Sequence, residues 1–268
     1  MINFLAEEVN ENMKVFGLVH IMYIVIGLAI VIPLAIYVSK KRGWDKKVFL
    51  VAAILLGLGE SIRTLGLVEL GSNGGYYLSP QYIPLHLCAI QIFFIIGILL
   101  SKSNKAIRFW CAIMYPTLVA GAAMALLIPS PEGTDTFLSF RGFQFFASHL
   151  VLMFVGIYMY LTKPVKFGWG TFGMVVLFMC VSLIGAIYIN AILGGASTNV
   201  NFWFLAYPPQ EGLPLLNMDN GWGMYVFNLG WVTMLLLGIT YIPVIVRYYR
   251  DKKAGLLDEN IEFKEVSF

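Results

Sequence analysis

Apolar stretches of bilayer-spanning length follow one another along the chain, separated by short polar connections. A transmembrane helix needs roughly 20 predominantly apolar residues. Seven stretches meet this requirement, at residues 16–39, 47–67, 81–100, 106–128, 142–161, 170–193 and 222–246. Their connections are polar or rich in Gly and Pro, which is typical of loops at the membrane surface. The pattern therefore predicts an all-α, polytopic membrane protein, with a seven-helix domain over 1–250 and a charged tail over 251–268.

The composition points the same way. Of the 268 residues, 59% are hydrophobic and only 12% are charged, which excludes an ordinary soluble domain. The three cysteines all fall within predicted helices, so we expect no disulfide framework. The first apolar stretch does not have the form of a signal peptide, because the basic run Lys40-Lys41-Arg42 follows it instead of preceding it.

Lysine and arginine gather in alternate connections. One side of the predicted membrane domain carries 15 of them and the other carries only Lys14 and Arg141, with Arg63 inside a predicted helix. The positive-inside rule then places the N-terminus outside and the C-terminus in the cytoplasm of a multi-pass cell-membrane protein. The net charge of +3 reflects this topology, and no basic stripe with interleaved aromatic residues suggests nucleic-acid binding.

Five ionisable side chains lie inside the predicted spans, where such groups are costly and usually functional. They are His20, Glu60, Arg63, His86 and His149. The three histidines and Arg63, together with Cys88, fall in the half of the membrane that the charge pattern places outside. Polar residues without a common role would be scattered over different depths of the membrane. We therefore expect these residues, which come from four helices, to form one polar site.

Some of these residues also have a plain structural interpretation. Glu60 and Arg63 are three residues apart on one helix face and could form an ion pair that only fixes packing. His20 could bond a backbone carbonyl near the membrane surface. Cys111 and Cys180 are expected to act as small hydrophobic residues.

Cys88 stands out among the cysteines because of its neighbours. Gln81, Pro84, Cys88 and Gln91 fall on one stripe of the helix predicted over 81–100, so Cys88 should face the polar interior and not lipid. A nucleophilic cysteine needs a base within hydrogen-bond reach.

The base for Cys88 should come from another helix. On a regular helix His86 would lie about 200 degrees from Cys88, on the opposite face. His149 lies at matching depth and is the expected base, while His86 would orient, polarise or bind a substrate. Only a distortion of the first turn by Pro84 would change this assignment.

Two further features lie at the predicted outer surface. The connection over 194–221 is long, dense in aromatic residues and without Lys or Arg, so it is a candidate lid or binding loop, or an aromatic belt. Arg141 could bind a phosphate or extend its charge to the head-group region.

Several of these segments resemble the transmembrane protein 164 family, whose bacterial branch comprises YwaF-like integral membrane proteins. The similar segments are IPLHLC at His86, FRGFQFFASHLVLM at His149, NFWFLAYPP at Asn201 and LLNMDNGWGMY at Tyr225, and the likeness extends from FGLVHIMY at His20 to the seventh helix. The chain departs from the family pattern in the last loop. There it has Asn201-Phe202 in place of an Asn-Tyr pair, and it lacks a Gly-Pro-Trp-Pro-Trp-Tyr-like end.

The resemblance implies an activity: animal members look like phospholipid acyltransferases that pass a fatty acyl group through a cysteine thioester. By position, the implied cysteine is Cys88 and the implied helper is His149. His86 is a third candidate catalytic residue. The candidate substrate-binding residues are His20, Glu60, Arg63, Gln91, Arg141, Asn201, Trp222 and Tyr225.

We therefore expect a membrane-embedded Cys/His lipid acyltransferase or transacylase that needs no metal or other cofactor, with membrane phospholipids or lysophospholipids as its partners. A zinc site built from the histidines and Glu60 is one alternative. A non-catalytic lipid or small-molecule transporter using the same polar groups is another. A retinal photoreceptor is disfavoured, because residues 222–246 contain no lysine for a Schiff base.

The predicted orientation can be tested in intact cells. A membrane-impermeant thiol reagent should label Cys88 in preference to Cys111, because only Cys88 lies in the outer half of the predicted bundle. Mass spectrometry of the labelled peptides measures the ratio. Preferential labelling of Cys111 would show that the orientation is reversed.

Overall fold

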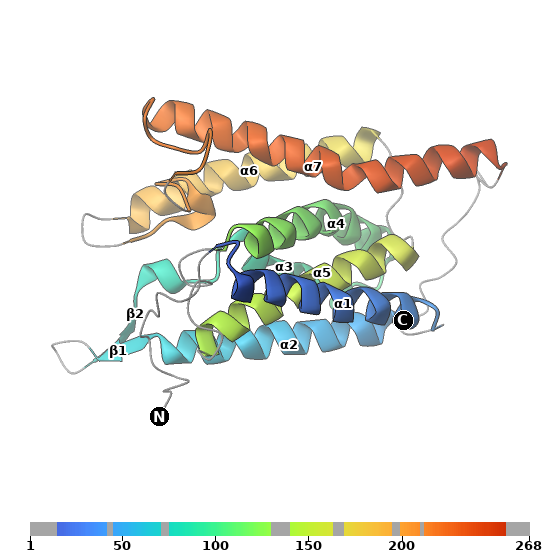
Figure 1. The fold of residues 1–268 in the computed structure, drawn as a ribbon, viewed down its shortest axis with the longest axis horizontal. Coiled ribbons are helices and arrows are strands. Elements are labelled where there is room, and N and C mark those ends of the chain that lie inside the picture. The colour runs from blue at the N-terminus through green and yellow to red at the C-terminus, as the bar shows by residue number, and fades with distance from the viewer. Residues whose placement is uncertain are drawn as a thin grey trace.

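The computed structural model describes residues 15–41, 45–70, 75–129, 140–162, 169–194, 199–209 and 212–255. These residues form seven α-helices, drawn in Figure 1. The helices are α1 (Leu18–Ser39), α2 (Asp45–Gly66), α3 (Leu87–Leu100), α4 (Asn104–Leu127), α5 (Phe140–Thr162), α6 (Trp169–Leu193) and α7 (Trp222–Lys253). The seven predicted apolar stretches are thus confirmed as helices, and most boundaries differ by only a few residues.

Helix α3 is the exception. Six of the helices are long and apolar enough to cross a membrane, but α3 has only 14 residues. The expected start at 81 is wrong: residues Pro80–Tyr82 form a single 3₁₀ turn, and the chain is then extended at Ile83 and His86. Pro84 explains the break, since a proline disfavours helical backbone at the residue before it. The first helical residue is Leu87.

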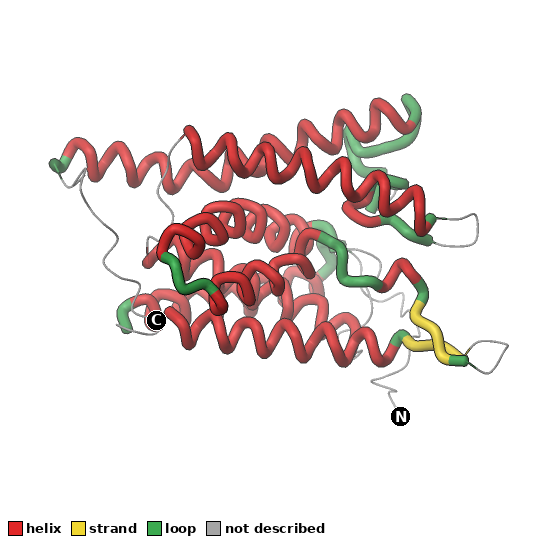
Figure 2. Tube along the Cα trace, turned by 180° about the vertical axis from the view of Figure 1, so that it is seen from behind, coloured by secondary structure: helices red, strands yellow, loops and turns green. Residues whose placement is uncertain are grey.

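A short β-hairpin connects α2 to the segment before α3. Strands β1 (Val68–Leu70) and β2 (Tyr76–Leu78) pair antiparallel, with Val68 opposite Leu78. The all-α prediction omitted it. The hairpin lies beyond the last turn of α2, at one end of the molecule (Figure 2). We call this end, where α3, α5 and α7 begin, the hairpin end, and the other the tail end.

The helices form two layers. Helices α1 to α5 make one bundle, and α6 and α7 lie beside it as a pair (Figures 1 and 2). Helix α4 contacts α3 and α5 on one side and α6 and α7 on the other. Its middle, residues 111–118, is buried on every face, as expected of a helix that is apolar all round and lies at the centre of a bundle. The core of the protein is therefore organised around α4.

Toward the tail end, polar contacts attach α7 to the bundle. The Tyr115 hydroxyl donates to the backbone carbonyl of Thr240 at 3.3 Å, and the buried Arg247 guanidinium donates to the carbonyl of Tyr160. At the start of α2, the Tyr158 hydroxyl donates to the Asp45 carboxylate. These bonds satisfy polar groups that would otherwise be buried without partners.

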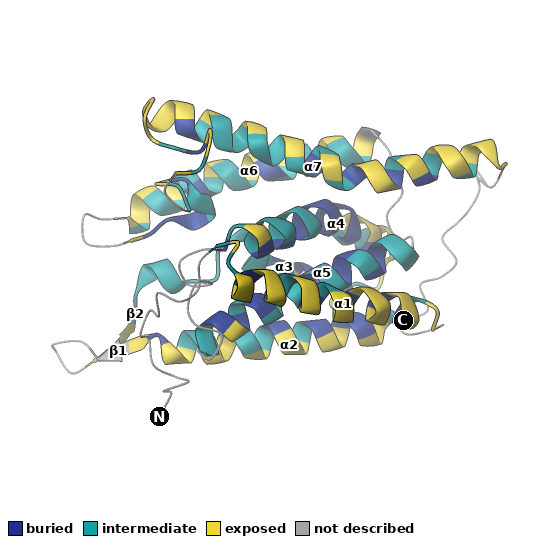
Figure 3. Ribbon diagram, viewed as in Figure 1, coloured by how far each residue is buried: buried dark blue, intermediate teal, exposed yellow. Residues whose placement is uncertain are grey.

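Exposed residues follow the outer faces of the helices (yellow in Figure 3), and many of them are large and apolar. On α6 the exposed set recurs every three to four residues and therefore forms one face: Leu177, Val181, Ile184, Tyr188 and Ile192. Similar exposed faces follow α1 and α7. A soluble monomer rarely exposes so much contiguous apolar surface, whereas a surface in contact with lipid requires it. The fold is that of a multi-pass helical membrane protein.

Glycines bring α4 and α5 close together. A Cβ atom at Gly156 would lie 2.5 Å from Cγ2 of Val119 and 2.9 Å from Cδ2 of Leu118, which is closer than real Cβ contacts. Such close approach at small residues is how membrane helices gain packing contacts.

Gly156→Ala should therefore destabilise the protein by about 1–3 kcal/mol, because the added methyl group overpacks the contact between α4 and α5. Gly57→Ala is the matched control: no atom lies within 4 Å of a Cβ there, so only the gain in helix propensity acts. Thermal unfolding of the purified protein in detergent measures both. A Gly156→Ala variant as stable as Gly57→Ala would contradict this account of the packing.

Candidate functional site

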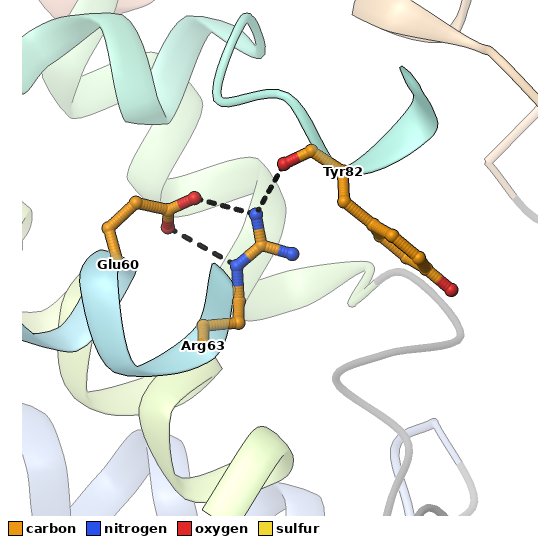
Figure 4. A network of polar contacts seen from close by, with 3 residues as sticks. All are labelled: Glu60, Arg63 and Tyr82. Atoms are coloured by element: carbon orange, nitrogen blue, oxygen red, sulfur yellow. Dashed lines mark hydrogen bonds and ion pairs between the residues drawn. The ribbon is translucent and has the colours of Figure 1, made fainter. Parts of the chain in front are cut away.

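The segment that precedes α3 is fixed to α2 by an ion pair. Arg63 donates from Nη2 to Oε1 of Glu60 at 2.6 Å and from Nε to Oε2 at 3.3 Å. The same Nη2 also donates to the backbone carbonyl of Tyr82 at 3.4 Å (Figure 4). Only 14% and 18% of the Arg63 and Glu60 side chains are exposed. The predicted ion pair is therefore present. Through the Tyr82 carbonyl it also fixes the segment that leads into α3.

Cys88 lies in the first turn of α3 and faces α4. A Cβ atom placed on Gly121 of α4 would lie 3.4 Å from its sulfur. One turn further along both helices, Gln91 Nε2 donates to Thr117 Oγ1 at 3.2 Å, and both side chains are fully buried. Cys88 and Gln91 thus share the α4-facing side of α3, as their spacing predicts. Gln81 and Pro84 do not belong to this stripe, because they precede the helix.

The start of α3 supplies hydrogen-bond donors beside the Cys88 sulfur. The first helical bond runs from the N–H of Ile90 to the carbonyl of His86 at 3.0 Å. The N–H groups of Leu87, Cys88 and Ala89 therefore belong to the first turn, which has no helical acceptors to offer them. Such a turn carries partial positive charge, which stabilises a thiolate and can stabilise an oxyanion.

His86 is the residue that caps this turn, with extended backbone and no capping bond from its side chain. The 200-degree separation expected between His86 and Cys88 on a regular helix does not apply, because His86 lies outside α3. The aromatic rings of Phe202 and Phe204 lie against its imidazole, with ring centroids 5.6 and 5.4 Å away. The α6–α7 connection therefore reaches the entry to α3 at His86.

His149 is positioned by its own helix. Its Nδ1 lies 2.6 Å from the backbone carbonyl of Phe145, one turn earlier in α5, and the Phe145 ring packs against it at 4.4 Å. A carbonyl only accepts hydrogen bonds, so Nδ1 carries the proton in the neutral ring and Nε2 is the basic nitrogen. Helices α2 and α5 pack against each other, so Glu60 and His149 lie on contacting helices.

Three bonds fasten the loop that joins α6 to α7. Trp203 Nε1 donates to the backbone carbonyl of Leu85 at 3.0 Å, immediately before His86. Trp222 Nε1 donates to the carbonyl of Leu205 at 2.8 Å, and the buried Tyr225 hydroxyl donates to that of Phe204. Trp222 and Tyr225 were expected to bind substrate. In the structure their polar atoms hold the loop.

Two asparagines shape the same loop from within. Asn201 Oδ1 accepts from the N–H groups of Ala206 and Tyr207 at 2.9 and 3.3 Å, and its Nδ2 donates to the Tyr207 carbonyl. The Asn190 side chain bonds both backbone groups of Phe202. Asn201 therefore structures the loop, although it was expected to contact substrate.

Trp203 and Phe204, which follow in the loop, have left-handed backbone conformations, with φ of 59° and 55°. Bulky residues rarely adopt this conformation, which costs of order 1–3 kcal/mol each. Buried packing and the bonds from Trp222 and Tyr225 hold the strained turn in place.

His20 and Arg141 complete the predicted set. Both ring nitrogens of His20 are occupied by backbone groups: Nδ1 accepts from Phe16 at 2.9 Å, and Nε2 donates to Leu126 at 2.7 Å. His20 therefore joins α1 to the end of α4, and its expected role in substrate binding is not supported. Arg141 lies in the first turn of α5, half-buried, at the hairpin end.

Among the described residues, no group of three or more His, Cys, Asp or Glu side chains is close enough to hold a metal ion. The alternative of a zinc site is not supported by these residues. The sequence did not predict that Tyr82, Trp203 and Gly121 belong to the site. Tyr82 contributes its backbone carbonyl and Gly121 contributes the lack of a side chain, and neither kind of contribution leaves a signal in the sequence.

Fold and site together describe a multi-pass membrane protein with a cysteine at the start of a short inner helix, α3, and a buried histidine on α5, a helix that packs against α2 and α4. A sequence profile of the TMEM164 family matches residues 15–241, and the chain belongs to that family. The predicted family resemblance is thus confirmed. Searches of curated proteins and of solved structures give no significant match.

Removing the arginine of the Glu60–Arg63 pair should loosen the entry to α3. Arg63→Ala leaves a mostly buried carboxylate without its partner and the Tyr82 carbonyl without a donor, so we expect a loss of about 1–3 kcal/mol in stability. Hydrogen exchange at residues 82–85 should accelerate.

Arg250→Ala is the control for Arg63→Ala. It breaks the pair with Asp251, in which the arginine side chain is 71% exposed, and such pairs contribute about 0–1 kcal/mol. Unchanged exchange at residues 82–85 in Arg63→Ala would show that the ion pair does not fix this segment.

Proposed function

We propose that the protein is a membrane-embedded acyltransferase that carries an acyl group as a thioester on Cys88. The observation that carries the proposal is the position of Cys88. It lies in the first turn of α3, directed between helices, and is only partly buried. A cysteine thiol becomes a nucleophile when a base takes its proton during the attack, and the amides of a first helical turn can stabilise the negative charge that develops there. The family resemblance implies the same chemistry.

In the first half-reaction, the Cys88 thiol would transfer its proton to Nε2 of His149 as the sulfur attacks the ester carbonyl carbon of the donor. The first-turn amides of α3 would hold the oxyanion. The C–O bond of the ester then breaks, and the proton on His149 passes to the departing alcohol oxygen. The products are an acyl thioester on Cys88 and a deacylated lipid.

The second half-reaction reverses these roles. A hydroxyl group of the acceptor gives its proton to His149, and its oxygen attacks the thioester carbonyl. The C–S bond breaks, and the thiolate recovers the proton from His149. His86, adjacent to the first turn and in contact with Phe202 and Phe204, would orient the bound lipid. No cofactor enters either step.

Glycerolipids fit the depth of this site. Their ester bonds lie just below the head groups, and Cys88 is the second residue of α3, at the end where Arg141 begins α5. The donor and acceptor would be phospholipids or lysophospholipids, with Arg141 near the phosphate. If the hairpin end is the outer one, as the charge pattern predicts, the substrate comes from the outer leaflet of the cell membrane.

The test is intact-mass spectrometry of the protein purified with native lipid. We expect an added acyl mass that hydroxylamine removes and that is absent from Cys88→Ala, while Cys111→Ala and Cys180→Ala keep it. Cys88→Ala should still fold, with a loss of about 1–2 kcal/mol at most. His149→Ala should slow acylation by about 10²–10⁴-fold, the usual contribution of a general base.

Two results would contradict the proposal. One is lipid acyl transfer by folded Cys88→Ala, which would exclude the thioester. The other is wild-type protein that binds and moves lipid without ever carrying an acyl group, which would favour the transporter.

A further inference from the structure

Gly121 of α4 is the residue that faces the Cys88 sulfur. A Cβ atom built there would meet only Cys88 Sγ at 3.4 Å and Cδ2 of Leu87 at 3.9 Å. The glycine is itself partly exposed. This differs from Gly27, Gly97 and Gly156, at which a Cβ atom would lie less than 3.0 Å from a side chain. Those three glycines allow helices to approach, whereas Gly121 leaves room beside a sulfur.

The sulfur also lies where the two layers of helices meet. Cys88 packs against the core of the α1–α5 bundle, while Leu87, its neighbour, packs against a cluster formed by Val175, Met179, Leu237 and Tyr241 of α6 and α7. Ala120, next to Gly121, contacts the same cluster. A group attached to the sulfur on the side of Gly121 would therefore enter apolar surroundings between α4 and the α6–α7 pair.

We propose that Gly121 determines which acyl groups Cys88 can carry, because it is the wall against which the thioester carbonyl and the first methylene groups lie. This inference rests on the proposed function. A thiol needs little room, but a thioester adds a planar group directly at the sulfur. A side chain at position 121 would occupy that volume in proportion to its size. The apolar neighbours Leu87 and Ala120 suit a hydrocarbon chain and not a polar acyl group.

Substitutions of Gly121 can test this role, because a small side chain fits at this position without a steric clash. At 3.4 Å a methyl group at position 121 is in ordinary contact with the sulfur, so Gly121→Ala should fold and gain helix propensity. Gly121→Val fills more of the same space. Gly57→Ala and Gly57→Val are matched controls on α2, where no atom lies within 4 Å of a Cβ.

The experiment compares two reactions at Cys88 in protein reconstituted into lipid nanodiscs. The first is alkylation by iodoacetamide, which adds a small group. The second is acylation by an activated long-chain fatty ester, measured as a hydroxylamine-sensitive mass on the Cys88 peptide. We expect Gly121→Ala, which adds one carbon atom, to slow acylation and Gly121→Val, which adds three, to slow it further, by about tenfold or more, as overpacking does. Alkylation should change by less than about twofold, the effect of a few tenths of a kcal/mol.

The outcomes separate the two proposals. Acylation of Gly121→Val at the wild-type rate would overturn the role of Gly121 and leave the thioester intact. Equal slowing of alkylation and acylation would overturn it as well, because the substitution would then only close access to the sulfur. A wild-type protein that is alkylated but never acylated at Cys88 would overturn the proposed function, and the role of Gly121 with it.

Discussion

Inside a bilayer every backbone polar group needs a partner within the protein, and the segment before α3 has to meet this requirement with a single 3₁₀ turn in place of α-helical hydrogen bonds. With 14 residues, α3 covers roughly 21 Å of a hydrocarbon core about 30 Å thick. The chain before it therefore runs through protein at membrane depth in non-helical form. Arg63 bonds the Tyr82 carbonyl and Trp203 bonds the Leu85 carbonyl. These two bonds, from α2 and from the α6–α7 loop, allow a helix to start inside the bundle with Cys88 in its first turn.

Other features of the site follow from that constraint. The Glu60–Arg63 pair lies at the end of α2 and is largely buried, which is tolerable because each charge is matched by the other. The loop that carries Trp203 is shaped by hydrogen bonds made by the side chains of Asn201, Trp222 and Tyr225. Residues that look like substrate ligands in the sequence thus support the start of α3. Their connection to Cys88 is the backbone that they position.

The sequence was sufficient to predict the helices because apolar length is a strong signal in a membrane protein. It also predicted that Cys88 and Gln91 share a face, since their spacing is helical. It failed at residues 81–86, where the apolar run Ile83-Pro-Leu continues the pattern of a span although Pro84 ends the helix. For His20 the plain interpretation, a bond to a backbone carbonyl, is confirmed. The sequence could not name its partners, Phe16 and Leu126, because they bond it through backbone atoms, about which side-chain identity carries no information.

If the first turn of α3 is the site of acyl transfer, as proposed, an acyl group on Cys88 has a defined position. The most direct measurement is an experimental structure of the protein in lipid, determined after reaction with a non-hydrolysable acyl analogue that alkylates Cys88. The account predicts density for the acyl chain on the sulfur, passing Gly121, with its carbonyl oxygen about 2.7–3.1 Å from first-turn N–H groups of α3. A carbonyl directed away from this turn, or a chain that leaves the sulfur away from Gly121, would contradict it.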